Sequence, residues 1–79
     1  MLYDVINAKY LKDYKITLVF EDGKTGIVDF SNYLDNKGVF ADFKDINYFK
    51  KFSINKDLGT ICWPGGQDIA PETLYSKLA

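Results

Sequence analysis

Residues 15–30 read KITLVFEDGKTGIVDF, and this stretch decides the fold. Its first half alternates apolar and polar side chains, with Ile16, Leu18 and Phe20 at every second position. Because successive side chains of a strand point to opposite faces, these three residues share one face. The pattern therefore predicts a half-buried strand from Lys15 to Glu21.

Turn signals on both sides make this strand the centre of a meander. Asp22-Gly23 follows it directly and favours a two-residue hairpin turn, because Gly tolerates positive φ. The chain then returns as a strand over 24–30. On the other side, the polar break at 12–14 has hairpin length and follows an aromatic and β-branched run over 2–11. The first 30 residues thus predict an antiparallel three-stranded meander.

Beyond the meander the pattern changes to short helices, two further strands and a closing helix. Ser31 and Asp45 are placed to cap helical turns, Gly38 to end one with positive φ, and Pro71 to open the last helix. The expected elements are helical turns over 31–34 and 46–51, strands over 52–54 and 60–63, and a helix over 71–78. Runs of strands with helices on one side favour the α+β class. We expect one domain over 1–79, with the C-terminal helix packed on a single five-stranded open sheet.

Composition narrows the possible functions. The 79 residues include eleven acidic and ten basic ones, and every basic residue is Lys, with no Arg and no His. Nucleic-acid-binding domains usually carry a basic face rich in Arg, so binding of nucleic acid by this chain alone is not expected. Without His, the usual general base and the commonest metal ligand are missing. We expect no enzyme activity, no metal and no cofactor.

Cysteine usage and the chain start indicate a cellular location. The single cysteine, Cys62, lies between Ile61 and Trp63, which predicts a buried thiol and no internal disulfide. The first residues lack a basic region followed by an apolar run, and apolar stretches are too short to span a membrane. We therefore expect a cytoplasmic protein.

The run from Trp63 to Tyr75 reads WPGGQDIAPETLY. It resembles the Trp-Pro-x-Gly-x-Asp-x-x-Pro-Glu-x-Leu-Tyr ending of the family called domain of unknown function 2442. The N-terminal half is similar as well, at 20–23 and 28–30, so the resemblance covers essentially the whole chain. It implies a small bacterial α+β protein whose gene often lies beside another small gene, in a toxin–antitoxin-like arrangement. It implies no catalytic residues.

The turn within this motif supports two interpretations. In the structural one, Trp63 anchors the edge of the core, Gly65 and Gly66 make the turn, and Asp68 caps or braces the last helix. In the functional one, Trp63, Pro64, Gly65, Gly66 and Asp68 form a surface for a partner, because aromatic residues beside a rigid turn are typical interface anchors. The residues alone leave both interpretations open.

The sequence favours a non-catalytic protein-binding module, the antitoxin-like half of a two-gene unit. The expected partners are the product of an adjacent gene and a second copy joined through a sheet edge. Two alternatives remain open. One is a nucleic-acid-binding regulator that acts within a complex, and the other is a small enzyme that uses carboxylates around Asp68.

Overall fold

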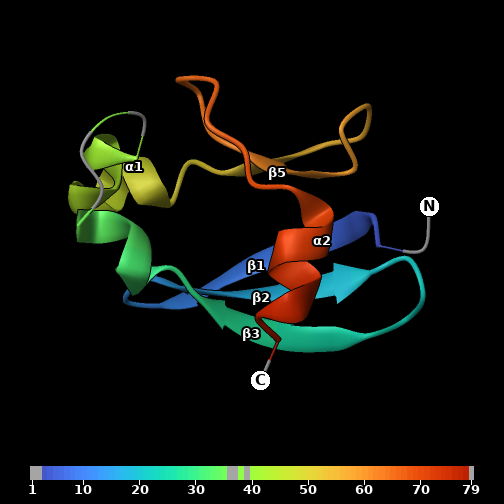
Figure 1. Ribbon diagram of the computed structural model, residues 1–79. Helices are drawn as coiled ribbons and strands as arrows, with labels where there is room; N and C mark the ends of the chain where they lie inside the picture. Colours follow the sequence, from blue (N-terminus) through green and yellow to red (C-terminus); the bar gives the residue numbers. More distant parts are fainter. Residues whose placement is uncertain (1–2, 36–37, 39, 79) are drawn as a thin grey trace.

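The computed structural model describes residues 3–35, 38 and 40–78. In chain order the elements are β1 (Val5–Lys12), β2 (Lys15–Phe20), β3 (Thr25–Asp29), the 3-10 helices η1 (Ser31–Asp35) and η2 (Ala41–Lys44), α1 (Ile46–Phe49), β4 (Ser53–Asn55), β5 (Thr60–Cys62) and α2 (Pro71–Ser76) (Figure 1). The α+β class is confirmed. Leu2, where the first strand was expected to begin, lies outside the described residues.

Strands β1, β2 and β3 form an antiparallel sheet in that order, as the meander predicts. The turn between β2 and β3 differs from the expected two-residue form. The N–H of Gly23 donates to the Phe20 carbonyl, and the Phe20 N–H donates to the Lys24 carbonyl, so the loop has a third residue, Glu21. A two-residue turn needs positive φ at Asp22 too; here Gly23 alone, at φ +90°, supplies it.

Strand β1 carries two irregularities in its pairing with β2. The register shifts between Val5 and Asn7 and again between Tyr10 and Lys12. Each shift leaves two β1 residues opposite one β2 residue, which is the definition of a β-bulge. The side chains at the two shifts, Ile6 and Leu11, are 57% and 47% exposed.

Strands β4 and β5 pair with each other and form a separate two-stranded sheet. The expectation of one five-stranded sheet is therefore wrong. The two sheets meet where the Val5 N–H donates to the Gly59 carbonyl at 2.8 Å. The bulge at Ile6 follows directly, and a bulge bends the strand and disrupts the ladder. We attribute the separation of the sheets to this bend.

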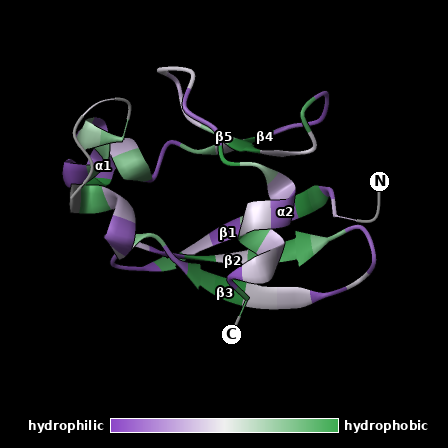
Figure 2. Cartoon of the chain, viewed as in Figure 1, coloured by the Kyte–Doolittle hydropathy of each residue, from purple (hydrophilic) through white to green (hydrophobic). Residues whose placement is uncertain are grey.

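The core lies between the inner face of the meander and a second layer made by α1, β5 and α2 (Figure 1). Ile16, Leu18 and Phe20 are fully buried there, as their alternation predicts. An aromatic cluster fills one end, with ring centroids 4.4 Å apart for Phe43 and Trp63. Figure 2 shows hydrophobic segments in the strands, whereas the β2–β3 turn is hydrophilic. Among the described residues, no helix has the length and apolar character needed to cross a membrane.

Two of the short helical segments, α1 and η1, begin where an acidic residue accepts a backbone hydrogen bond. The Asp45 carboxylate accepts from the Asn47 N–H at 3.0 Å, which confirms the predicted cap of α1. At η1, the Asp29 carboxylate accepts from the Ser31 N–H at 2.9 Å, so Asp29 and not Ser31 provides the acceptor. Gly38 has the predicted positive φ, at +118°.

Candidate functional site

The motif turn that follows β5 is closed by its own backbone. The Gly66 N–H donates to the Trp63 carbonyl at 2.9 Å, and the Trp63 N–H donates to the Gln67 carbonyl at 3.0 Å. Cys62 and Asp68 form an isolated antiparallel bridge just outside this turn. Gly66 adopts φ +92°, a conformation that residues with a Cβ rarely take. The turn is thus a tight hairpin that reverses the chain.

A tyrosine from α1 holds this turn from the side. The Tyr48 hydroxyl donates to Gln67 Oε1 at 2.5 Å and accepts from the Gly65 N–H at 2.9 Å. A Cβ at Gly65 would lie 2.7 Å from that hydroxyl oxygen. The absence of a Cβ at Gly65 therefore permits the close approach of Tyr48.

Trp63 belongs to the core. Its side chain is 2% exposed, and its Nε1–H donates to the Phe49 carbonyl at 2.8 Å. A buried indole with its polar atom satisfied offers no side chain to a partner. The other predicted surface residues, Pro64, Gly65, Gly66 and Asp68, are exposed.

Asp68 does not cap the last helix. The N-cap residue of α2 is Ala70, which makes no side-chain cap hydrogen bond, so the predicted capping role is wrong. Asp68 instead lies in the bridge to Cys62 and braces the chain before the helix. Pro71 opens α2, because its ring fixes φ and its missing N–H has no acceptor in the first turn.

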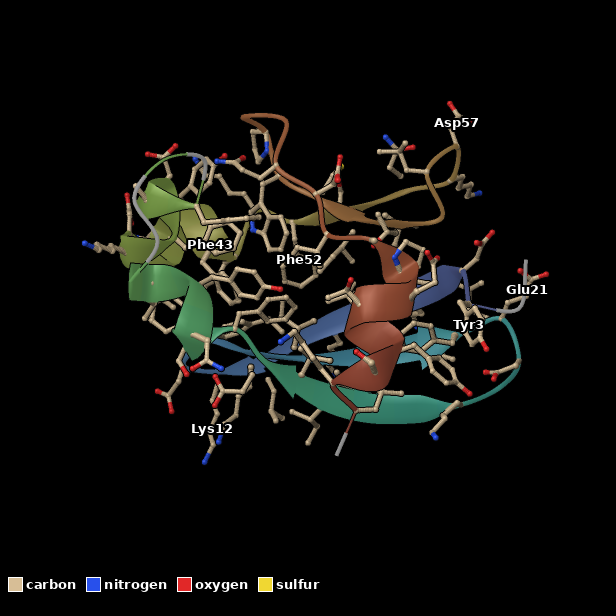
Figure 3. All side chains as sticks on the ribbon, viewed as in Figure 1. Tyr3, Lys12, Glu21, Phe43, Phe52 and Asp57 are labelled. Atoms are coloured by element: carbon tan, nitrogen blue, oxygen red, sulfur yellow. The ribbon has the colours of Figure 1, made fainter. Side chains whose placement is uncertain are left out.

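A second candidate surface lies at the end of the molecule that holds the β2–β3 and β4–β5 turns. Tyr3, Ile6 and Leu58 are 41%, 57% and 52% exposed there, and we call them the end patch. Leu58 precedes Gly59, whose carbonyl binds the Val5 N–H, so Ile6 and Leu58 flank one backbone contact. Figure 3 shows Tyr3 at this end and Lys12 at the opposite end.

A cleft of about 230 Å³ opens beside the end patch. Its lining residues are Asp4, Val5, Ile6, Glu21, Ile54, Lys56 and Gly59. Two carboxylates and one ammonium group line it, and Asp57 lies on the adjoining turn at the same end (Figure 3). The charge around the cleft is therefore predominantly negative.

The β4–β5 turn that carries Leu58 is internally hydrogen-bonded. Asn55 Oδ1 accepts from the N–H groups of Asp57 and Leu58, at 3.0 and 3.1 Å. The Gly59 N–H donates to the Asn55 carbonyl at 2.8 Å. These bonds fix the turn, so the side chain of Leu58 projects from a preorganised backbone.

Tyr3 is held in place by contacts with α2. Its ring packs edge-on against Tyr75 with centroids 4.7 Å apart. The Tyr75 hydroxyl donates to Asp22 Oδ2 at 2.6 Å, which lowers the pKa of the Asp22 carboxyl and raises the pKa of the phenol. This bond ties α2 to the β2–β3 turn and supports the position of Tyr3.

Sequence reasoning did not identify the end patch. One signal was available at Val5-Ile6, where two consecutive β-branched residues break the alternation of a strand with one solvent face. Leu58 gave a second signal, as an apolar residue inside a polar turn. No set of three or more His, Cys, Asp or Glu side chains in the described ranges could hold a metal ion.

The chain is thus a small α+β protein with a three-stranded meander, a separate β-hairpin and a motif turn closed by Tyr48. Residues 5–78 match the family described as protein of unknown function DUF2442. The chain belongs to this family, which confirms the resemblance read from its motif. Searches of curated proteins and of solved structures give no match.

Proposed function

We propose that this protein is a non-catalytic protein-binding module whose partner docks on the end patch of Tyr3, Ile6 and Leu58. The single observation that supports the proposal is the exposure of these three large apolar side chains: Ile6 lines the cleft, and Tyr3 and Leu58 each adjoin a lining residue in the sequence, Asp4 and Gly59. Removing apolar surface from water contributes about 25 cal/mol per Å² to a complex, before the cost of association is subtracted. Clustered exposed apolar residues beside charged groups are typical of protein interaction sites.

The charge around the cleft indicates the chemistry of the partner. Asp4 and Glu21 line the cleft with Lys56 as their basic neighbour, and Asp57 adds a further negative charge close by. A partner with Lys or Arg side chains around an apolar centre fits this surface, since complementary potentials speed and orient association. The antitoxin-like role is the specific form of the proposal, with the product of an adjacent gene as the partner.

Co-expression with the product of the adjacent gene, followed by pull-down, tests the proposal. Ile6→Lys places a positive charge in the patch and should weaken capture by about tenfold or more, equivalent to about 1.4 kcal/mol. Leu11→Lys is the matched control, because Leu11 is a similarly exposed residue at the other bulge of the same strand. Its capture should equal that of the wild type.

Thermal unfolding followed by circular dichroism, measured before capture is compared, should show that both variants remain folded. The absence of a complex with the wild-type chain would contradict the proposal. Equal losses from Ile6→Lys and Leu11→Lys would contradict the assignment of the end patch.

A further inference from the structure

The outer edge of β3 has backbone groups that the sheet does not use. The Phe20 N–H donates to the Lys24 carbonyl and the Phe30 N–H donates to the Tyr14 carbonyl, at 2.8 Å each. In an antiparallel ladder, hydrogen-bonded residue pairs alternate with pairs that are not hydrogen-bonded. Between the two bonded pairs above, the backbone N–H and C=O groups of Gly26 and Val28 therefore point towards β2. The N–H and C=O groups of the alternate residues point outward; these are Thr25, Ile27 and Asp29.

This edge lacks three of the devices that usually prevent strands from pairing, namely a bulge, a proline and a lysine. The register from Lys15 opposite Asp29 to Val19 opposite Thr25 runs without a shift, so β3 has no bulge. The strand sequence TGIVD contains no Pro and no Lys. Leu78 packs against Gly26, whose partner Leu18 is buried, so this contact covers the inner face of the strand and not its edge.

The side chains along this edge are complementary to a second copy of themselves. In an antiparallel pair centred on Ile27, this residue lies opposite Ile27 of the second copy, and Thr25 lies opposite Asp29 of the second copy. Every outward N–H and C=O then finds a partner. The Asp29 carboxylate accepts hydrogen bonds from the Ser31 N–H and the Ser31 side chain, and its two oxygens have about four lone-pair sites, so it can also accept from a threonine hydroxyl. A slip centred on Asp29 would place two carboxylates opposite each other, which is unfavourable.

We propose that a second copy of this chain adds its β3 antiparallel to β3, with the two-fold axis at Ile27. The side chain of Ile27 is 42% exposed in the single chain, and the pairing covers it with its own counterpart. The interface is isologous, as in most homodimers. It uses a different strand from the end patch, so dimerisation and partner binding are compatible.

Sedimentation of the full chain over a range of concentrations tests this proposal. The wild type should shift from monomer to dimer by about 1 mM, a range typical of weak association. Ile27→Lys should remain a monomer, because two ammonium groups then face each other across the axis. Leu11→Lys, which alters an exposed residue on β1, should dimerise like the wild type.

A charge-exchange experiment distinguishes this register from other modes of association. Ile27→Glu alone should also be monomeric, whereas an equimolar mixture of Ile27→Lys and Ile27→Glu should form a heterodimer. Only direct opposition of the two residues at position 27 predicts this recovery. A wild-type chain that stays monomeric at about 1 mM, or a mixture that stays monomeric, would overturn the proposal.

The outcome is independent of the proposed function. Ile27→Lys should still capture the partner, and Ile6→Lys should still dimerise. Loss of partner capture by Ile27→Lys, with no dimer of the wild type, would mean that β3 receives a strand of the partner and not a second copy.

Discussion

The two outer strands of the meander, β1 and β3, differ in how their free edges are protected. Strand β1 has two bulges and the lysines Lys9 and Lys12, and the β4–β5 turn packs against it. Strand β3 has five regular residues and none of these features. The contact at β1 is the bond from the Val5 N–H to the Gly59 carbonyl. Bulges, lysines and covering loops are the usual means of protecting an edge from strand addition. One edge of this sheet is therefore protected and the other is open.

The comparison also shows that protection of an edge has a consequence for its side chains. The bulges that interrupt β1 leave Ile6 and Leu11 exposed to solvent. The regular ladder of β3 keeps Val28 fully buried and exposes Ile27 on the opposite face. In the two proposals above, β1 contributes side chains to binding and β3 contributes backbone groups.

The largest expected effect on stability comes from disturbing the β4–β5 turn, which covers the edge of β1 through the bond from the Val5 N–H to the Gly59 carbonyl. Gly59→Ala should lower the free energy of unfolding by about 2–4 kcal/mol, through the strain of a positive φ and the crowding of a new Cβ. Gly59 has φ +70°, and its Cβ would lie 2.5 Å from Asp4 Oδ1. Urea denaturation measures the change.

Gly66→Ala is the control for this substitution. Its φ is +92°, but a Cβ there meets no atom within 4 Å, so strain alone should cost about 1–2 kcal/mol. If the two substitutions lowered the free energy of unfolding equally, crowding between the new Cβ and Asp4 would contribute nothing, and the close packing of the β4–β5 turn against β1 would not matter for stability.

The same contrast explains how far the sequence predicts the fold. The alternation of β2 is a local signal, and it correctly assigns Ile16, Leu18 and Phe20 to the core. The pairing of β4 and β5 as a separate sheet has no such signal, because each strand has three residues. Their position depends on distant contacts, such as the buried hydrogen bond from the Thr60 hydroxyl to the Ile69 carbonyl.

The motif turn shows the same limit at the level of a site. Its sequence predicts a tight turn and places the glycines correctly, yet it leaves the role of Trp63 open. Residues distant in sequence determine the position of Trp63 and of the turn. The Phe49 carbonyl accepts the indole N–H, and the Tyr48 hydroxyl binds both Gly65 and Gln67. Burial of Trp63 favours the structural interpretation of the motif, and its exposed residues remain a predicted partner surface.

A smaller effect on stability is expected from weakening the motif turn that follows β5, because β5 leads into this turn and pairs with β4 next to β1. Tyr48→Phe removes two hydrogen bonds and keeps the ring, so the free energy of unfolding should fall by about 1–2 kcal/mol. Tyr14→Phe is the control, since its hydroxyl makes one exposed bond to the Lys44 carbonyl, at 3.1 Å, and its loss should cost about 0.5 kcal/mol. Chemical denaturation of both variants measures the difference. A larger loss in Tyr14→Phe would contradict the role of Tyr48.

The smallest effect concerns the turn that leads into the open edge of β3. The hydrogen bond from the Tyr75 hydroxyl is the main cause of the lowered pKa of Asp22, below its usual value of 3.8. A lowered carboxyl pKa stabilises the folded state above the unfolded-state pKa, and this stability is lost as the pH falls through the folded-state pKa. Tyr75→Phe should therefore raise the pKa of Asp22 towards 3.8 and reduce the loss of stability in acid.

Carboxyl ¹³C NMR titration between about pH 2 and 6 measures this pKa directly. Asp29 provides the control within the same molecule, because its pKa is lowered by hydrogen bonds from Ser31 and not by Tyr75. Its titration should be the same in the wild type and in Tyr75→Phe. If Asp29 shifted together with Asp22, the substitution would have disturbed β3 as a whole, and the turn and the open edge could not be treated as separate parts of the sheet. A shift confined to Asp22 would instead show that α2 holds the turn without altering the edge, which leaves β3 in the regular conformation that strand pairing requires.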